Sequence, residues 1–168
     1  MSNSATDIKL HTISVYVANK PGVLARIAQI FARRGFNIDS LVVSPSAEGY
    51  SRMTIASQGS TEGLEQIILQ VSKLVDVMHC MDHATDLSII REMALAKLHV
   101  TADQRTEALQ ICEHFGGKTV DLTLTSLTVM VTGNSEKLDA CISMLREFDL
   151  VELVRTGKVV MARGDQVT

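Results

Sequence analysis

The sequence predicts an α+β protein made of two β-α-β-β-α-β units in tandem. Alternating apolar residues and helical apolar stripes follow one another in that order over residues 13–78, and the same order returns over residues 93–154. Matching landmarks, such as Gly59 and Gly133, recur at similar places in the two halves. Each unit is therefore expected to be ferredoxin-like, with one antiparallel four-stranded sheet and two helices on one of its faces.

The first unit starts with Ile13, Val15 and Val17, which alternate with polar residues as in a strand. A turn containing Pro21 and Gly22 then leads into a helix, which Gly35 ends. Strands are expected at 13–17, 38–44, 52–57 and 74–78, and helices at 24–31 and 64–71. The sheet face opposite the helices would carry Thr12, Ser14 and Tyr16, which suit either solvent or an interface.

The second unit repeats this order after a linker. Its first helix has an apolar stripe that ends at Gly116 and Gly117. Strands are expected at 93–98, 120–124, 127–131 and 150–154, and helices at 108–115 and 138–145. We expect a first domain at 1–83, a linker at 84–91 and a second domain at 92–168.

Composition excludes several classes of protein. The 168 residues are 46% hydrophobic and 21% charged, which fits one or two small globular domains and no large enzyme. The net charge is −3 and aromatic residues are 4%, so a nucleic-acid surface is not expected. The N-terminal residues lack a signal peptide and no apolar run is long enough to span a membrane, which predicts a cytoplasmic protein. Three separated cysteines predict buried thiols.

Candidate binding chemistry concentrates at Asn19-Lys20-Pro21-Gly22-Val23-Leu24, between the first strand and the first helix. Asn19 is a good N-cap residue, Pro21 suits a first helical turn and Gly22 lets a ligand approach the backbone. Free N–H groups at a helix start attract a carboxylate. The residues also suit a helix start with no ligand, so the motif alone leaves both interpretations open.

A second polar residue, Asn37, begins the next strand, and its amide can both donate and accept hydrogen bonds. An amino acid, with its ammonium and carboxylate, requires that pairing. Leu24, Ile38 and Val43 supply apolar surface for a branched aliphatic side chain. Asn37 is equally acceptable as a turn residue with no ligand.

Several motifs together resemble a known family. They are Asn19-x-Pro21-Gly22-x-Leu24, Arg34-Gly35-Phe36-Asn37-Ile38-Asp39-Ser40-Leu41, Ser51-Arg52-Met53-Thr54-Ile55, Lys73-Leu74-Val75-Asp76-Val77, Arg91-Glu92-Met93-Ala94-Leu95, Gly133-Asn134-Ser135-Glu136-Lys137-Leu138-Asp139, Thr156-Gly157-x-Val159 and Arg163-Gly164-Asp165. The chain from about Leu10 onward resembles the regulatory small subunit of acetohydroxyacid synthase, also called acetolactate synthase. The first motif is shared by amino-acid-binding ACT domains generally.

The resemblance implies that the first domain is an ACT domain and that the chain is a non-catalytic regulatory subunit. Such a subunit binds a catalytic large subunit, activates it and confers feedback inhibition by valine, leucine or isoleucine. It also implies a homodimer that holds the effector between paired ACT domains. The implied effector-binding residues are Asn19, Gly22, Asn37, Leu24, Ile38, Val43 and Ser44. Thiamine diphosphate, flavin and magnesium belong to the catalytic subunit, so no cofactor is expected here.

Other kinds of site have little support in the sequence. His79-Cys80-x-x-His83 would place neighbouring side chains on opposite faces of a strand, so no metal site is expected. Glu107, Glu113 and His114 have no nucleophile beside them, and no catalytic residue is expected. The main alternative function is a stand-alone ACT-domain sensor that acts on a different enzyme or regulator.

Overall fold

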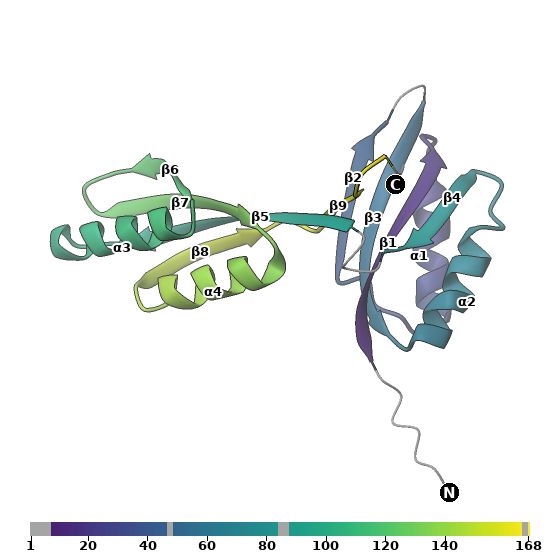
Figure 1. Ribbon diagram of the computed structural model, residues 1–168, viewed down its shortest axis with the longest axis horizontal. Helices are drawn as coiled ribbons and strands as arrows, with labels where there is room; N and C mark the ends of the chain where they lie inside the picture. The colour runs from purple at the N-terminus through teal and green to yellow at the C-terminus, as the bar shows by residue number, and fades with distance from the viewer. Residues whose placement is uncertain (1–7, 47–48, 84–87, 166–167) are drawn as a thin grey trace, which may run out of the picture. The chain divides into compact units, whose positions relative to one another are not determined.

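The computed structural model describes residues 8–46, 49–83, 88–165 and 168, and these form two compact units (Figure 1). One unit combines Met1–Ile89 with Gly157–Thr168, and the other is Ile90–Thr156. This division differs from the predicted domains 1–83 and 92–168, because the last twelve residues group with the first unit. Of the expected linker 84–91, residues 88–91 are strand and 84–87 lie outside the described residues.

The first unit has the predicted β-α-β-β-α-β order. Its sheet has the strand order β2-β3-β1-β4 and is antiparallel throughout. The last strand starts at Val77 rather than Leu74, because Leu74, Val75 and Asp76 form a turn in which the Val77 N–H donates to the Leu74 carbonyl. The elements are β1 Lys9–Ala18, α1 Val23–Arg33, β2 Ser40–Pro45, β3 Tyr50–Gly59, α2 Thr61–Val71 and β4 Val77–Asp82.

The core of the first unit lies between the sheet and its two helices. Alternate residues of β1 and β3 meet the helices because side chains of a strand point to opposite faces in turn. From α1 the buried residues are Val23, Ile27 and Phe31, which have the spacing of one helix face. The fully buried large side chains of this unit are Ile13, Val15, Val17, Ile27, Phe31, Ile55, Leu64 and Ile67.

On the opposite sheet face, which the sequence left open between solvent and an interface, the middle of the two central strands is buried and the edge strands are more exposed. Ser14 and Thr54 are 3% and 5% exposed. The segment Gly157–Thr168 belongs to this unit and approaches the face closely, since a Cβ on Gly157 would lie 2.7 Å from Val42 Cγ2. The main-chain oxygen of Thr168 accepts a hydrogen bond from Arg52 on β3. The chain's own C-terminal segment therefore takes part of this face.

The second unit repeats the order, with the sheet β6-β7-β5-β8. Its core packs α3 and α4 against alternate residues of β5 and β7, with Leu98, Leu127, Val129 and Leu138 fully buried. A short strand that the sequence analysis did not predict, β9 Val159–Ala162, pairs with β5 but lies in the segment Gly157–Thr168, which belongs to the first unit. The elements are β5 Ser88–His99, α3 Ala102–His114, β6 Lys118–Leu122, β7 Ser126–Gly133, α4 Ser135–Leu145 and β8 Asp149–Arg155.

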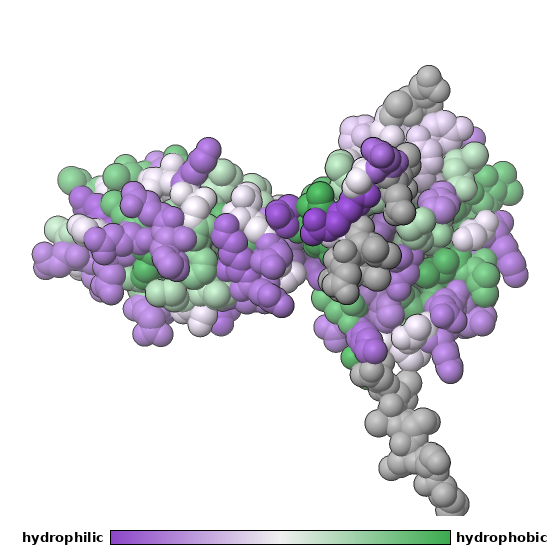
Figure 2. All heavy atoms as spheres, in the orientation of Figure 1, coloured by the Kyte–Doolittle hydropathy of each residue, from purple (hydrophilic) through white to green (hydrophobic). Residues whose placement is uncertain are grey.

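The helices of the second unit bury one face against the sheet and expose the other to solvent. Over α3 and α4 the visible face of the second unit is mainly hydrophilic (Figure 2). Only Ala108 and Cys112 of α3 are buried, which agrees with one packed face and one solvated face. Among the described residues, no helix is long and apolar enough to cross a membrane.

Candidate effector site

The start of α1 is held open by a left-handed glycine. Gly22 is the N-cap residue, with φ of 84°, and no side chain hydrogen-bonds to the first turn. A Cβ at Gly22 would meet nothing within 4 Å, so the space beside the backbone is empty. The sequence prediction was wrong in two details: Asn19 is not the N-cap, and Pro21 precedes the helix. No side chain caps the first turn and the turn has no acidic residue, although the Val23 N–H donates to the Lys20 carbonyl at 3.5 Å.

The other three helices contrast with α1. Ser60 caps α2 and Asn134 caps α4, in each case by accepting a hydrogen bond from an N–H of the first turn. Thr101 and Gln104 form a capping box at α3. Each of these three helices also has an acidic residue in its first turn. Among the described helices, α1 is thus the one whose first turn has neither a side-chain cap nor an acidic residue to compete with an anion for the positive end of the helix dipole.

Two cations flank this helix start. Arg26 Nη2 lies 2.6 Å from Asp76 Oδ2, and Lys20 Nζ lies 3.4 Å from Asp76 Oδ1. The hydrogen bond from Arg26 is the main cause that lowers the pKa of Asp76. Asp76 therefore stays ionised and fixes the α2–β4 turn against the start of α1. The loop between β1 and α1 is also fixed to the β2–β3 connection, because the Asn19 N–H donates to the Gly49 carbonyl at 2.8 Å.

Asn37 lies in the extended segment between α1 and β2, and its side chain is exposed. Its main-chain carbonyl accepts a 2.6 Å hydrogen bond from Ser57 Oγ, which anchors it to β3. Its Nδ2 donates to Asp39 Oδ1 at 2.9 Å. The amide oxygen of Asn37 has no hydrogen bond to the described residues, so it can accept one from an ammonium group.

Within one chain, Asn19 and Asn37 do not meet. The 11 residues of α1 separate them, which is about 16 Å at 1.5 Å per residue. Their anchors on the sheet side, Gly49 and Ser57, are eight positions apart, about 26 Å in an extended chain. One small amino acid cannot touch both residues of the same chain.

The other residues predicted to bind the effector do not all lie on one surface. Val43 pairs with buried Met53 and shares its sheet face, whereas Ser44 pairs with Arg52 on the opposite face. Leu24 and Val43 are 38% and 47% exposed, so both present apolar surface outward. Ile38 packs partly against the core. The structure thus leaves Leu24 and Val43 as accessible apolar candidates and turns Ser44 away from Val43.

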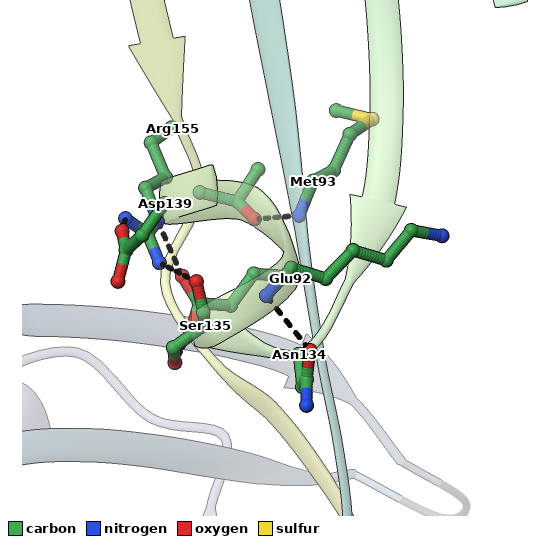
Figure 3. Close-up of polar contacts among 8 residues, drawn as sticks. Glu92, Met93, Asn134, Ser135, Asp139 and Arg155 are labelled. Atoms are coloured by element: carbon green, nitrogen blue, oxygen red, sulfur yellow. Dashed lines mark hydrogen bonds and ion pairs between the residues drawn. The ribbon is translucent and has the colours of Figure 1, made fainter. Parts of the chain in front are cut away.

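A charge network centred on the buried Glu92 holds the start of α4 in the second unit (Figure 3). Glu92 accepts from Arg155 Nε at 2.6 Å and from the Ser135 hydroxyl, and Arg155 Nη1 lies 2.5 Å from Asp139 Oδ1. Burial alone would lower the pKa of Arg155, but its hydrogen bonds to Glu92 and Asp139 outweigh that effect and raise it. The network ties β5, α4 and β8 together. The sequence motifs include Glu92, Ser135 and Asp139 but not Arg155, and their spacing did not predict that these residues meet.

The residues considered for a metal do not converge. His83 is buried and bonds Ser14 Oγ and Ser88 Oγ at 2.6 and 3.2 Å, whereas His79 is exposed. In the part of the chain that the structure describes, no three His, Cys, Asp or Glu side chains are placed to hold a metal ion. Burial raises the pKa of Cys80 to about 12 and that of Cys141 to about 11, so both are protonated thiols at neutral pH.

Comparison with known proteins covers nearly the whole chain. Residues 91–164 match the family described as "Small subunit of acetolactate synthase", and residues 13–79 match "AHAS small subunit-like ACT domain". A probable acetolactate synthase small subunit of Methanothermobacter thermautotrophicus is 44% identical over 93% of this chain and 94% of its own length. The acetolactate synthase small subunit of Mycobacterium bovis is 41% identical over 93% and 94%.

A solved structure is similar in fold as well. The acetolactate synthase small subunit of Thermotoga maritima superposes with a TM-score of 0.85 at 37% identity, and the match covers 94% of this chain and 99% of that one. The similarity spans both units, so it concerns the whole architecture and not the ACT domain alone.

Proposed function

The chain belongs to the acetolactate synthase small subunit family, and from this premise we propose that it activates a catalytic large subunit and confers feedback inhibition by valine or another branched-chain amino acid. Catalysis with thiamine diphosphate is assigned to the large subunit. The chain described here supplies the effector site and the contact that transmits its occupancy.

The observation that carries this proposal is the uncapped start of α1 at Gly22. An effector carboxylate placed there pairs with N–H groups that no side chain satisfies, and the helix dipole adds about 0.3–1 kcal/mol, up to about 2 kcal/mol in a partly buried site. Lys20 and Arg26 add positive charge nearby, although Asp76 neutralises part of it. Leu24 and Val43 offer apolar surface for the aliphatic side chain.

The effector site is proposed to span two chains. Asn19 and Gly22 lie too far from Asn37 within one chain, so the two halves of the recognition chemistry come from different subunits. The strand β2 is at the edge of its sheet, and an edge strand presents unpaired backbone groups to a partner. A homodimer that places the helix start of one chain against Asn37 of the other completes the site.

Calorimetric titration of the full chain with valine, leucine and isoleucine tests this proposal. We expect saturable binding that is lost in Gly22→Asp, because a carboxylate would then occupy the position of the ligand's own. Gly22→Asn is the matched control, since Asn tolerates a positive φ and has the same shape without the charge. Equal affinity in the two variants and the parent would refute the site.

Co-purification tests the partner. We expect a large thiamine-dependent protein to be retained by the tagged chain, and acetolactate synthase activity to rise when the chain is added to it. A stand-alone ACT-domain sensor would instead bind an amino acid without retaining or activating such a partner.

A further inference from the structure

Asp76 joins the α2–β4 turn to the loop that precedes α1. Its main-chain carbonyl accepts a hydrogen bond from the Ala18 N–H at 2.8 Å, at the end of β1. Its carboxylate contacts Lys20 in that loop and Arg26 in α1. The Asp76 side chain is 13% exposed, so it has lost much of its hydration and relies on these two cations. One side chain therefore connects the proposed effector site to the α2–β4 turn.

The two cations hold Asp76 unequally. Arg26 Nη2 lies 2.6 Å from Asp76 Oδ2, and its hydrogen bond is the main cause that lowers the pKa of Asp76. Lys20 Nζ lies 3.4 Å from Asp76 Oδ1, and the Lys20 side chain is 67% exposed. An ion pair whose lysine is this exposed contributes little, because water and salt compete for the ammonium. Lys20 is thus the cation that can leave Asp76 at small cost.

Lys20 also lies beside the position proposed for the effector's carboxylate. It precedes Gly22 by two residues, and its carbonyl accepts from the Val23 N–H at 3.5 Å, which keeps its main chain next to the first turn of α1. A lysine ammonium sits on a flexible stem, so it can turn from one carboxylate to another without a movement of the main chain. Asp76 and the effector's carboxylate therefore compete for the same ammonium.

We propose that Asp76 is an internal competitor for Lys20, and that the effector's carboxylate draws this lysine away and so loosens the α2–β4 turn. This inference rests on the proposed function, because it concerns the regulation of the same effector site. Arg26 and the hydrogen bond from Ala18 keep the turn in place after Lys20 has left. The coupling is reciprocal, so any contact that keeps Lys20 on Asp76 weakens effector binding by the factor by which the effector weakens that contact.

Calorimetric titration of the full chain with valine gives the first test. Asp76→Asn removes the charge of the competitor and keeps its size. Valine should bind this variant about two- to fivefold more tightly, which is the range that an exposed ion pair contributes. Glu65→Gln, which removes one negative charge from an exposed position of α2, is the matched control and should leave the affinity unchanged. A purely structural role of Asp76 predicts weaker valine binding in Asp76→Asn.

Lys20→Gln gives the second test, and its exposed side chain makes a folding defect unlikely to interfere with it. This variant should weaken valine binding about two- to fivefold. Val75 follows Leu74 in the turn, is 93% exposed and reports the turn through its methyl NMR signals. In the ligand-free Lys20→Gln chain these signals should lie nearer to their valine-bound positions, because Asp76 lacks Lys20 in both states. In the double variant the gain from Asp76→Asn should disappear, since no lysine is left to release.

The outcomes separate this inference from the proposed function. A parent chain that binds none of valine, leucine and isoleucine overturns both. If the parent binds valine, unchanged or weaker binding in the folded Asp76→Asn variant overturns the role of Asp76 alone, and so does a gain that persists in the double variant. If Asp76→Asn does not fold, Lys20→Gln decides. Unchanged valine affinity in Lys20→Gln, or Val75 signals that do not move toward their bound positions, would then overturn the inference.

Discussion

The network around Glu92 gives a quantitative prediction about stability. The Glu92 side chain is 4% exposed and that of Arg155 is 31% exposed. Removing one partner of a buried ion pair costs about 3–5 kcal/mol. Since Arg155 is partly solvated, water can reach the carboxylate that is left behind, and Arg155→Leu should cost about 2–3 kcal/mol in unfolding free energy.

A double-mutant cycle isolates the interaction. Glu92→Leu should cost less than Arg155→Leu, because Arg155 keeps its contact with Asp139 and its access to water. The double variant should cost less than the sum of the two by about 1–3 kcal/mol. On the same sheet, Lys97 and Glu152 form a pair whose side chains are 46% and 58% exposed. Lys97→Leu is therefore the control and should cost at most about 1 kcal/mol.

Two optical signals separate the units during urea unfolding. Tyrosine fluorescence reports the first unit, which holds both tyrosines, and far-ultraviolet circular dichroism reports both units. Arg155→Leu should move the circular dichroism transition of the second unit and leave the tyrosine transition nearly in place. Additivity within about 0.5 kcal/mol in the cycle would show that Glu92 and Arg155 do not stabilise the fold through each other, and the network would lose its assigned role.

Three other predictions concern the first unit. Mixing Asn19→Ala with Asn37→Ala chains should restore one valine site per mixed dimer, seen as partial stoichiometry by calorimetry; no recovery would contradict a shared site. Burial lowers the pKa of His83 in the folded chain, so as the pH falls the unfolded chain binds this proton first and stability should decrease from about pH 6.5 downward. His83→Asn should flatten the pH dependence of the urea midpoint. An unchanged dependence of the midpoint on pH would contradict the prediction. Truncation after residue 84 should retain activation of the catalytic subunit but weaken the valine response. Replacing residues 90–156 with a short linker should keep valine affinity, because Gly157–Thr168 remains. Equal, full valine regulation in both forms would argue against any role for the removed parts.

The regular elements could be predicted from the sequence because their apolar periodicity is strong. Ile13, Val15 and Val17 alternate as expected of a strand and are fully buried, and the helix stripes likewise face the cores. The start of α1 was predicted as an anion site from residue types, but its capping residue was not. Whether Asn19 or Gly22 is the N-cap depends on backbone torsions, and the φ of 84° at Gly22 decides it.

Long-range placement was harder to predict. The strand β9 has four residues, too few for periodicity to show, and nothing local indicates that Gly157–Thr168 groups with the first unit. The sequence analysis also did not predict that Arg52, Tyr16 and His79 lie side by side on three paired strands. The sequence does show that Tyr16 and Arg52 alternate with core residues, but placing them next to each other and to His79 requires the register of β1, β3 and β4.

The chain path bears on how the second unit can influence the first. The chain leaves the first unit at Ile89 and re-enters it at Gly157, so the second unit is joined to it by two covalent connections. The re-entering segment lies against Ser40 and Val42 on the edge strand β2, and the Thr168 main-chain oxygen accepts a hydrogen bond from Arg52 on β3. Because β2 also carries Val43 and Ser44, any change in the second unit that pulls on this segment acts on the strand proposed to meet the partner subunit. Under the proposed function, effector binding must favour one arrangement of the complex over another, and the two covalent connections are a physical route for that coupling.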